Sequence, residues 1–194
     1  MVLREPGDNL DMVQLIHDVR VVKAIDASGG AYGTCSVIND TDCCGDCTND
    51  LAEAWEFPNM VSGKGESGYI TKARIESETE SITPKLTLYL FKQEPTPADL
   101  VRLADGSINN SPCATNIADY IGKIDWPALE TIGTESYSNQ TVPASTGTFR
   151  LPFRCAPTSR NLYGILVSRD AFTQTAGDDI IITLTVEEMA VREN

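Results

Sequence analysis

Apolar side chains in this chain recur mostly at every second residue, which is the period of a β-strand and not the 3.6 residues of an α-helix. In KLTLYLFKQ, residues 85–93, one face of the predicted strand carries Leu86, Leu88 and Leu90. The segment NLYGILVSR, residues 161–169, is apolar on both faces, as expected of a central strand. The other predicted strands cover residues 20–26, 31–38, 52–57, 69–77, 120–126, 147–155 and 179–188.

Turn-forming residues separate these runs, for example Ser28-Gly29-Gly30, Asp105-Gly106 and Ala176-Gly177-Asp178-Asp179. Short strands with long polar connections predict an antiparallel β-sandwich, because alternating β-α units would need helical segments between the strands. Trp55 and Trp126 fall on predicted strands and are expected in the core. The 194 residues suit one domain with a sizeable core.

Two segments depart from the strand period. In residues 8–18, Leu10, Val13 and Ile16 are three residues apart, which permits a short amphipathic helix. In residues 96–105, Thr96 followed by Pro97 suits the start of a second helix. We therefore expect an N-terminal arm, residues 1–18, that orders against a neighbouring subunit, and a single β-sandwich domain over residues 19–194. Deleting the arm is expected to leave the sandwich folded and to weaken its binding to a partner.

Fifteen basic and twenty-eight acidic residues give a net charge of −13. Such a surface repels phosphate backbones and anionic lipid, so neither nucleic acid nor a membrane is an expected partner. No apolar run approaches the roughly 20 residues of a membrane-spanning helix. The N-terminus shows no secretory signal, which predicts synthesis in the cytosol.

Catalytic signatures are missing from the sequence. His17 is the single histidine and lies in an apolar pattern near the N-terminus, where a docked or exposed side chain is expected. Neither a glycine-rich phosphate loop nor a helical zinc-protease motif occurs. The alternating Glu76, Glu78 and Glu80 are expected to form a solvated face. We expect no enzyme activity, no metal site and no cofactor.

Six cysteines are many for a protein made in a reducing compartment. Zinc is disfavoured because only Cys44 and Cys47 have ligand spacing, and an EF-hand frame starting at Asp40 has Leu51 where its bidentate acid belongs. Disulfides remain, within or between chains, although some thiols staying reduced is the alternative. The candidates are Cys35, Cys43, Cys44, Cys47, Cys113 and Cys155. Cys113 lies in a connection between predicted strands and Cys155 lies where a strand passes into one, so both could reach outward.

Several segments, in order, resemble a family of proteins that decorate the heads of tailed phages. They are SGYITKARIES (67–77), LTLYLFKQEPTP (86–97), YIGKIDWPA (120–128) and FRLPFRCAPTSRNLYGILVSRDAFT (149–173). The resemblance spans about residues 20–186 and does not include the cysteine cluster. It implies a jelly-roll-like β-sandwich on the outside of an icosahedral shell, gripping the major capsid protein, with no enzyme activity.

These observations predict an external capsid decoration, or cement, protein of a phage virion, made in the bacterial cytoplasm. We expect it to bind the major capsid protein and itself, as a homotrimer or alternatively as a dimer. Leu10, Val13 and Ile16 are the contact candidates. Oxidation after release from the cell would add disulfides to the shell. The alternative function is a carbohydrate- or receptor-binding module of a phage tail or fibre, which would need exposed aromatic side chains around a groove.

Overall fold

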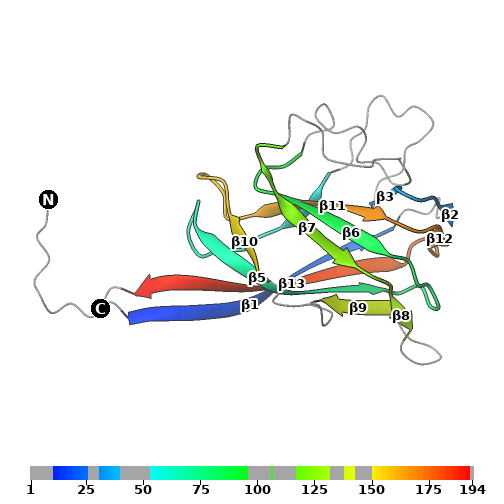
Figure 1. The fold of residues 1–194 in the computed structure, drawn as a ribbon, viewed down its shortest axis with the longest axis horizontal. Coiled ribbons are helices and arrows are strands. Elements are labelled where there is room, and N and C mark those ends of the chain that lie inside the picture. Colours follow the sequence, from blue (N-terminus) through cyan, green and yellow to red (C-terminus); the bar gives the residue numbers. More distant parts are fainter. Residues whose placement is uncertain are drawn as a thin grey trace, which may run out of the picture.

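A computed structural model describes residues 11–25, 31–39, 53–95, 106, 117–131, 138–142 and 150–192. Every regular element in these ranges is a β-strand, and all but two of the strands belong to two packed antiparallel sheets (Figure 1). The predicted antiparallel β-sandwich is therefore confirmed. The predicted helix over residues 96–105 lies outside the described residues.

The first sheet has six strands and contains both of the longest strands of the molecule. Its order is β1-β13-β5-β9-β8, and β10 pairs with β5 beside β9. The bounds are β1 (Asp11–Ala24), β13 (Asp179–Arg192), β5 (Ser67–Ser77), β9 (Ser138–Val142), β8 (Glu130–Thr131) and β10 (Leu151–Arg154).

The second sheet has five strands in the order β3-β11-β6-β7, with β4 also pairing with β11. A separate two-stranded sheet joins β2 to β12. The bounds are β3 (Val37–Ile38), β11 (Leu162–Ser168), β6 (Leu86–Phe91), β7 (Tyr120–Trp126), β4 (Trp55–Phe57), β2 (Ala31–Tyr32) and β12 (Phe172–Thr173).

This strand order is that of a jelly roll. If β3 and β4 are counted as one position, β9 and β10 as another along the same edge of β5, and the two-residue β8 is set aside, the two sheets have eight main positions, four in each. The two terminal strands, β1 and β13, are neighbours in the first sheet, and the middle hairpin β6-β7 lies in the second. A jelly roll is formed by two Greek keys that fold into two sheets in this way. The predicted jelly-roll-like sandwich is thus present in the topology itself.

The core follows from the period-two pattern. Leu86, Leu88 and Leu90 are at most 1% exposed and belong to the main hydrophobic cluster between the sheets. Trp55 and Trp126 are also buried there, as expected, and each indole N–H donates to a main-chain carbonyl, that of Ile38 or Ala73. The other face of the second sheet carries a smaller buried cluster of Val37, Phe91, Ile165 and Val167.

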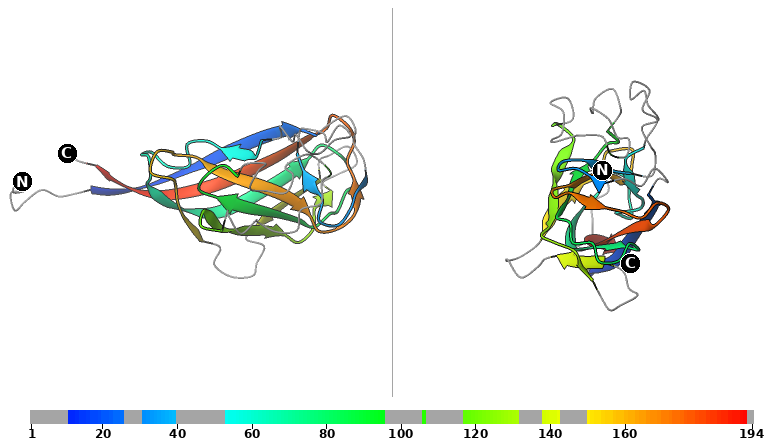
Figure 2. Two further views of the ribbon diagram at one scale, coloured as in Figure 1. Left: turned by 90° about the horizontal axis from the view of Figure 1, so that it is seen from above. Right: turned by 90° about the vertical axis from the view of Figure 1, so that its right-hand side faces the viewer.

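The predicted helix in residues 8–18 is wrong over the part that the structure describes. Residues 11–18 belong to β1, which pairs with β13 over fourteen consecutive residues (Figure 2). The same segment also carries a strand pattern, because every second residue from Leu15 to Val21 lies on the core side. Pairing with β13 favours this pattern over the helical spacing of Leu10, Val13 and Ile16. The predicted arm boundary after residue 18 falls inside this strand.

Candidate functional site

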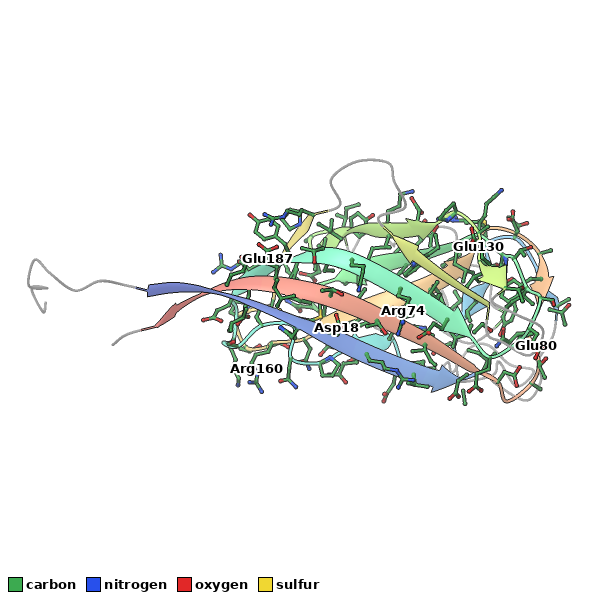
Figure 3. The ribbon with its side chains drawn as sticks, turned by 90° about the horizontal axis from the view of Figure 1, so that it is seen from below. Asp18, Arg74, Glu80, Glu130, Arg160 and Glu187 are labelled. Carbon is green, nitrogen blue, oxygen red and sulfur yellow. The ribbon has the colours of Figure 1, made fainter. Side chains whose placement is uncertain are left out.

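The outward face of the first sheet, which contains both fourteen-residue strands, is seen in Figure 3. On β1 the outward positions are Ile16, Asp18, Arg20 and Val22, which the register places beside β13. The Asp18 carboxylate accepts a hydrogen bond from the Thr185 hydroxyl at 2.6 Å. Ile16 is 64% exposed and Val22 is 38% exposed. This face therefore mixes charged side chains with aliphatic side chains that lack cover.

The free edge of this sheet is β1. Within the described part of the chain β13 is its only paired neighbour, and their register runs from Asp11 to Ala24 without a shift. Pairing of β13 with β5 stops at Glu188 opposite Gly68, so residues 11–14 and 189–192 form a two-stranded ribbon beyond the sandwich. Two-stranded ribbons are only marginally stable in water, which makes this end a candidate contact region.

Among the predicted contact residues, the structure describes the side chain of Ile16 alone. It lies on the outward face of β1 and is largely exposed, and its role as a contact stays a prediction. The backbone of Val13 pairs with Ala190, which places Val13 in the ribbon. Leu10 lies outside the described residues. Positions three apart on a strand alternate in face, so a spacing of three does not give the single stripe that it gives on a helix.

An open cavity of about 1070 Å³ lies at one end of the sandwich. Its lining includes Tyr69 and Tyr120, which come from β5 and β7. Tyr69 is 39% exposed and has the guanidinium of Arg150 stacked 5.5 Å from its ring centre. Burial raises the pKa of the Tyr120 hydroxyl, and the neighbouring Tyr89 raises it further. The remaining lining residues are Ser62, Gly65, Glu66, Ser67, Gly68, Lys92, Ala118, Ile121, Pro152, Phe153, Arg154 and Glu188.

Two neighbouring glutamates are fixed near this cavity by different partners. Glu188 is 3% exposed and accepts hydrogen bonds from the Ser62 amide, at 2.8 Å, and from the Ser62 hydroxyl. Glu187 points to the outward face, where both of its oxygens accept from Arg150 at 2.8 and 2.9 Å. The Nη2 atom of Arg150 donates to both Glu187 oxygens. This charge-assisted contact and the Tyr69 ring orient Arg150, so this end of the first sheet presents an ordered polar and aromatic surface.

Two of the six predicted disulfide cysteines lie within the described residues, and both are free thiols there. Cys35 is half-buried in the turn between β2 and β3, where its backbone has φ of 69°. Cys155 is 2% exposed and packs in the main core, so the prediction that it could reach outward is wrong. Burial raises the pKa of its thiol to about 11, and the charge of Glu188 adds to the rise. Cys43, Cys44, Cys47 and Cys113 lie outside the described residues, and their disulfides stay a prediction.

The remaining sequence candidates occupy ordinary structural positions. The Nε2 atom of His17 lies 3.2 Å from the carbonyl oxygen of Asn59, so the side chain is docked against the loop after β4. Glu76 pairs with Arg74 at 3.1 Å, and Glu78 accepts from the backbone amide of Asp179 at 3.0 Å. Over the described ranges, no group of three or more His, Cys, Asp or Glu side chains could hold a metal ion. The same ranges contain no helix long and apolar enough to cross a membrane.

Comparisons with known proteins identify no family for this chain. Neither the family models nor the curated proteins contain a match. Eight chains of solved structures match, among them one from a structure titled "Turnip yellow mosaic virus". That chain is 12% identical, the alignment covers 100% of this chain and 88% of that chain, and the TM-score is 0.29. A similarity this weak does not assign a fold, so the jelly-roll assignment rests on the strand order described above.

Sequence reasoning missed two features of this surface. The first is the free edge of β1, because the helical interpretation of residues 8–18 hid a strand of fourteen residues. The second is the cavity, although the sequence held a signal for it. Tyr69 and Tyr120 both stand near the starts of predicted strands, where aromatic side chains can line the end of a sandwich.

Proposed function

We propose that this chain is a structural protein of a virion, and more specifically an external decoration protein that binds and stabilises the head shell of a tailed phage. The observation that carries the proposal is a jelly roll whose first sheet ends in β1, a strand that has exposed aliphatic side chains and, among the described residues, no partner on its outer edge. Such an edge provides main-chain hydrogen bonds and apolar area for a protein partner. The motifs that resemble phage decoration proteins fall on β5, β6, β7, β10 and β11, which supports the same assignment.

The mechanism is binding energy alone. Each subunit would bridge neighbouring major capsid proteins and bury apolar surface against them, which raises the barrier to rupture of the shell. Because the protein would bind the assembled shell and not its separated parts, mass action converts that affinity into shell stability. The net charge of −13 suits an exterior position, away from packaged nucleic acid.

The cavity favours a second candidate, a carbohydrate- or receptor-binding module of a phage tail or fibre. Tyr69 and Tyr120 supply ring faces, and Lys92, Arg154 and Glu66 supply polar groups, a combination that binding sites for polar ligands share. Jelly rolls serve viral capsids and lectins alike, so the fold does not separate the two candidates.

Copy number separates them. We expect quantitative mass spectrometry of purified virions to find this chain at hundreds of copies, in a fixed ratio to the major capsid protein. The internal standards are a labelled peptide from this chain and one from the major capsid protein. A handful of copies per virion would contradict the decoration function and support the tail or fibre module.

A further inference from the structure

The free edge of β1 lacks most of the features that keep edge strands from pairing with other chains. Natural edges are usually short, bulged, interrupted by proline or covered. β1 is fourteen residues long, contains no proline and pairs with β13 without a register shift. Contacts between β1 and the second sheet run through inward side chains, for example Lys23, whose ammonium donates to the Glu53 carbonyl at 3.1 Å. These contacts lie on the core side of β1 and are made by side chains, so they do not pair with the main chain at its outer edge.

The outward residues of β1 form a pattern that is complementary to itself. In order they are Gln14, Ile16, Asp18, Arg20, Val22 and Ala24. When this strand is laid antiparallel to a second copy of itself with Val19 at the centre, Asp18 lies opposite Arg20. Ile16 then lies opposite Val22. Ile16 and Val22 are also two of the four exposed large hydrophobic residues that the described residues contain.

We infer that two copies of this chain pair through β1, antiparallel, about a two-fold axis at Val19 that is perpendicular to the sheet. In this arrangement Asp18 lies opposite the partner's Arg20, and Ile16 lies opposite the partner's Val22. The symmetry repeats each contact, so the outward face gains two ion pairs and two aliphatic pairs. Cross-strand pairs of both kinds stabilise antiparallel strands, and the two first sheets become one continuous sheet.

The charges select this register over its neighbours. A two-fold axis perpendicular to the sheet keeps the outward faces of both copies on one side. Outward residues must then lie opposite outward residues, so the axis can be centred only on a residue of β1 and not between two residues. Centred on Asp18, it would place two aspartates opposite each other. Centred on Arg20, it would place two arginines opposite each other. Like charges directly opposite destabilise a strand pair, which leaves Val19 as the favoured centre.

This interface would form in solution and does not depend on the proposed decoration function. Its symmetry agrees with a dimer and not with the expected homotrimer. The test is light scattering coupled to size-exclusion chromatography of the full chain over a range of concentrations. We expect a mass of twice 21.1 kDa at high concentration.

Charge reversal gives the decisive comparison. Arg20→Asp brings two aspartates face to face across the interface, and we expect the dimer dissociation constant to rise about tenfold or more. Asp18→Arg should do the same, although it also loses the hydrogen bond from Thr185. The double variant D18R/R20D exchanges the charges and should restore the dimer. Lys72→Asp, an exposed charge reversal on β5, is the matched control and should leave the mass unchanged.

Circular dichroism of each variant verifies that the β-sandwich remains folded. A wild-type chain that stays monomeric at every concentration, or that runs at three times 21.1 kDa, would overturn the inference. Single variants that dimerise as tightly as the wild type would also overturn it. Neither result bears on copy number in the virion, so failure of this interface and failure of the proposed function are distinguishable.

Discussion

At the scale of single residues, the burial of Cys155 shows that the alternation of buried and exposed side chains continues past the end of β10. This cysteine follows Arg154, the last residue of β10, and burial continues to alternate through Phe153, Arg154 and Cys155. We predicted that Cys155 could reach outward because it borders a connection between strands. Cys155 is, however, two positions after Phe153, so the period-two pattern places both side chains on the same face. The burial of this residue was therefore predictable from the sequence, whereas its proximity to Glu188 depends on long-range pairing of β5 with β10 and β13.

We expect Cys155 to resist alkylation in the folded protein. Iodoacetamide reacts with thiolate, and a pKa of about 11 leaves this buried thiol almost wholly protonated at pH 8. Peptide mass spectrometry after a short exposure at pH 8 should find Cys155 unmodified and Cys35, which is half-buried, modified faster. Denaturant should abolish the protection of Cys155. Equal labelling of both residues in the folded protein would contradict the core position.

The strands themselves were predictable to different degrees. Strands with strong alternation, such as β6 and β13, appear where the sequence predicts them, and so does β7, whose pattern is weaker. Strands of two residues, such as β8 and β12, carry too little pattern to be recognised, and β9 was missed as well because its sequence, SNQTV, is largely polar. Only the last five residues of β1, 20–24, were predicted as strand. Leu10, Val13 and Ile16 also fit a helical spacing, and only pairing with β13 excludes the helix.

The extent of β1 changes the expected effect of deleting residues 1–18. That deletion removes Asp11 to Asp18, which pair with Thr185 to Arg192, and it removes the contact between His17 and Asn59. We expect the melting temperature to fall by about 5 °C or more, because loss of a few kcal/mol shifts a domain of this size by that amount. Deleting residues 1–10 is the control, because it retains every β1 pair. Equal melting temperatures for the two deletions, by circular dichroism, would show that β1 contributes little to the fold.

At the scale of the whole molecule, period two and turn spacing predict a sandwich, but they do not fix which strands are neighbours. The jelly-roll order came from the resemblance to phage decoration proteins, and the structure provides it independently through the pairing of β1 with β13 and of β6 with β11. The cavity between β5, β7 and β10 depends on that order, since its aromatic residues are far apart in the sequence. The positions of Tyr69 and Tyr120 near strand starts therefore suggest aromatic side chains at an end of the sandwich, but they do not show that the two residues line one cavity.

A cryo-electron microscopy map of the intact particle whose genome encodes this chain tests the decoration function most directly. We predict density for a two-sheet sandwich at symmetry-related positions over the whole outer surface of the head, in contact with the major capsid protein. The matched control is a particle from which the gene has been deleted, and it should lack this density while retaining the shell. A head surface without the sandwich, or sandwich density confined to the tail, would contradict the decoration function.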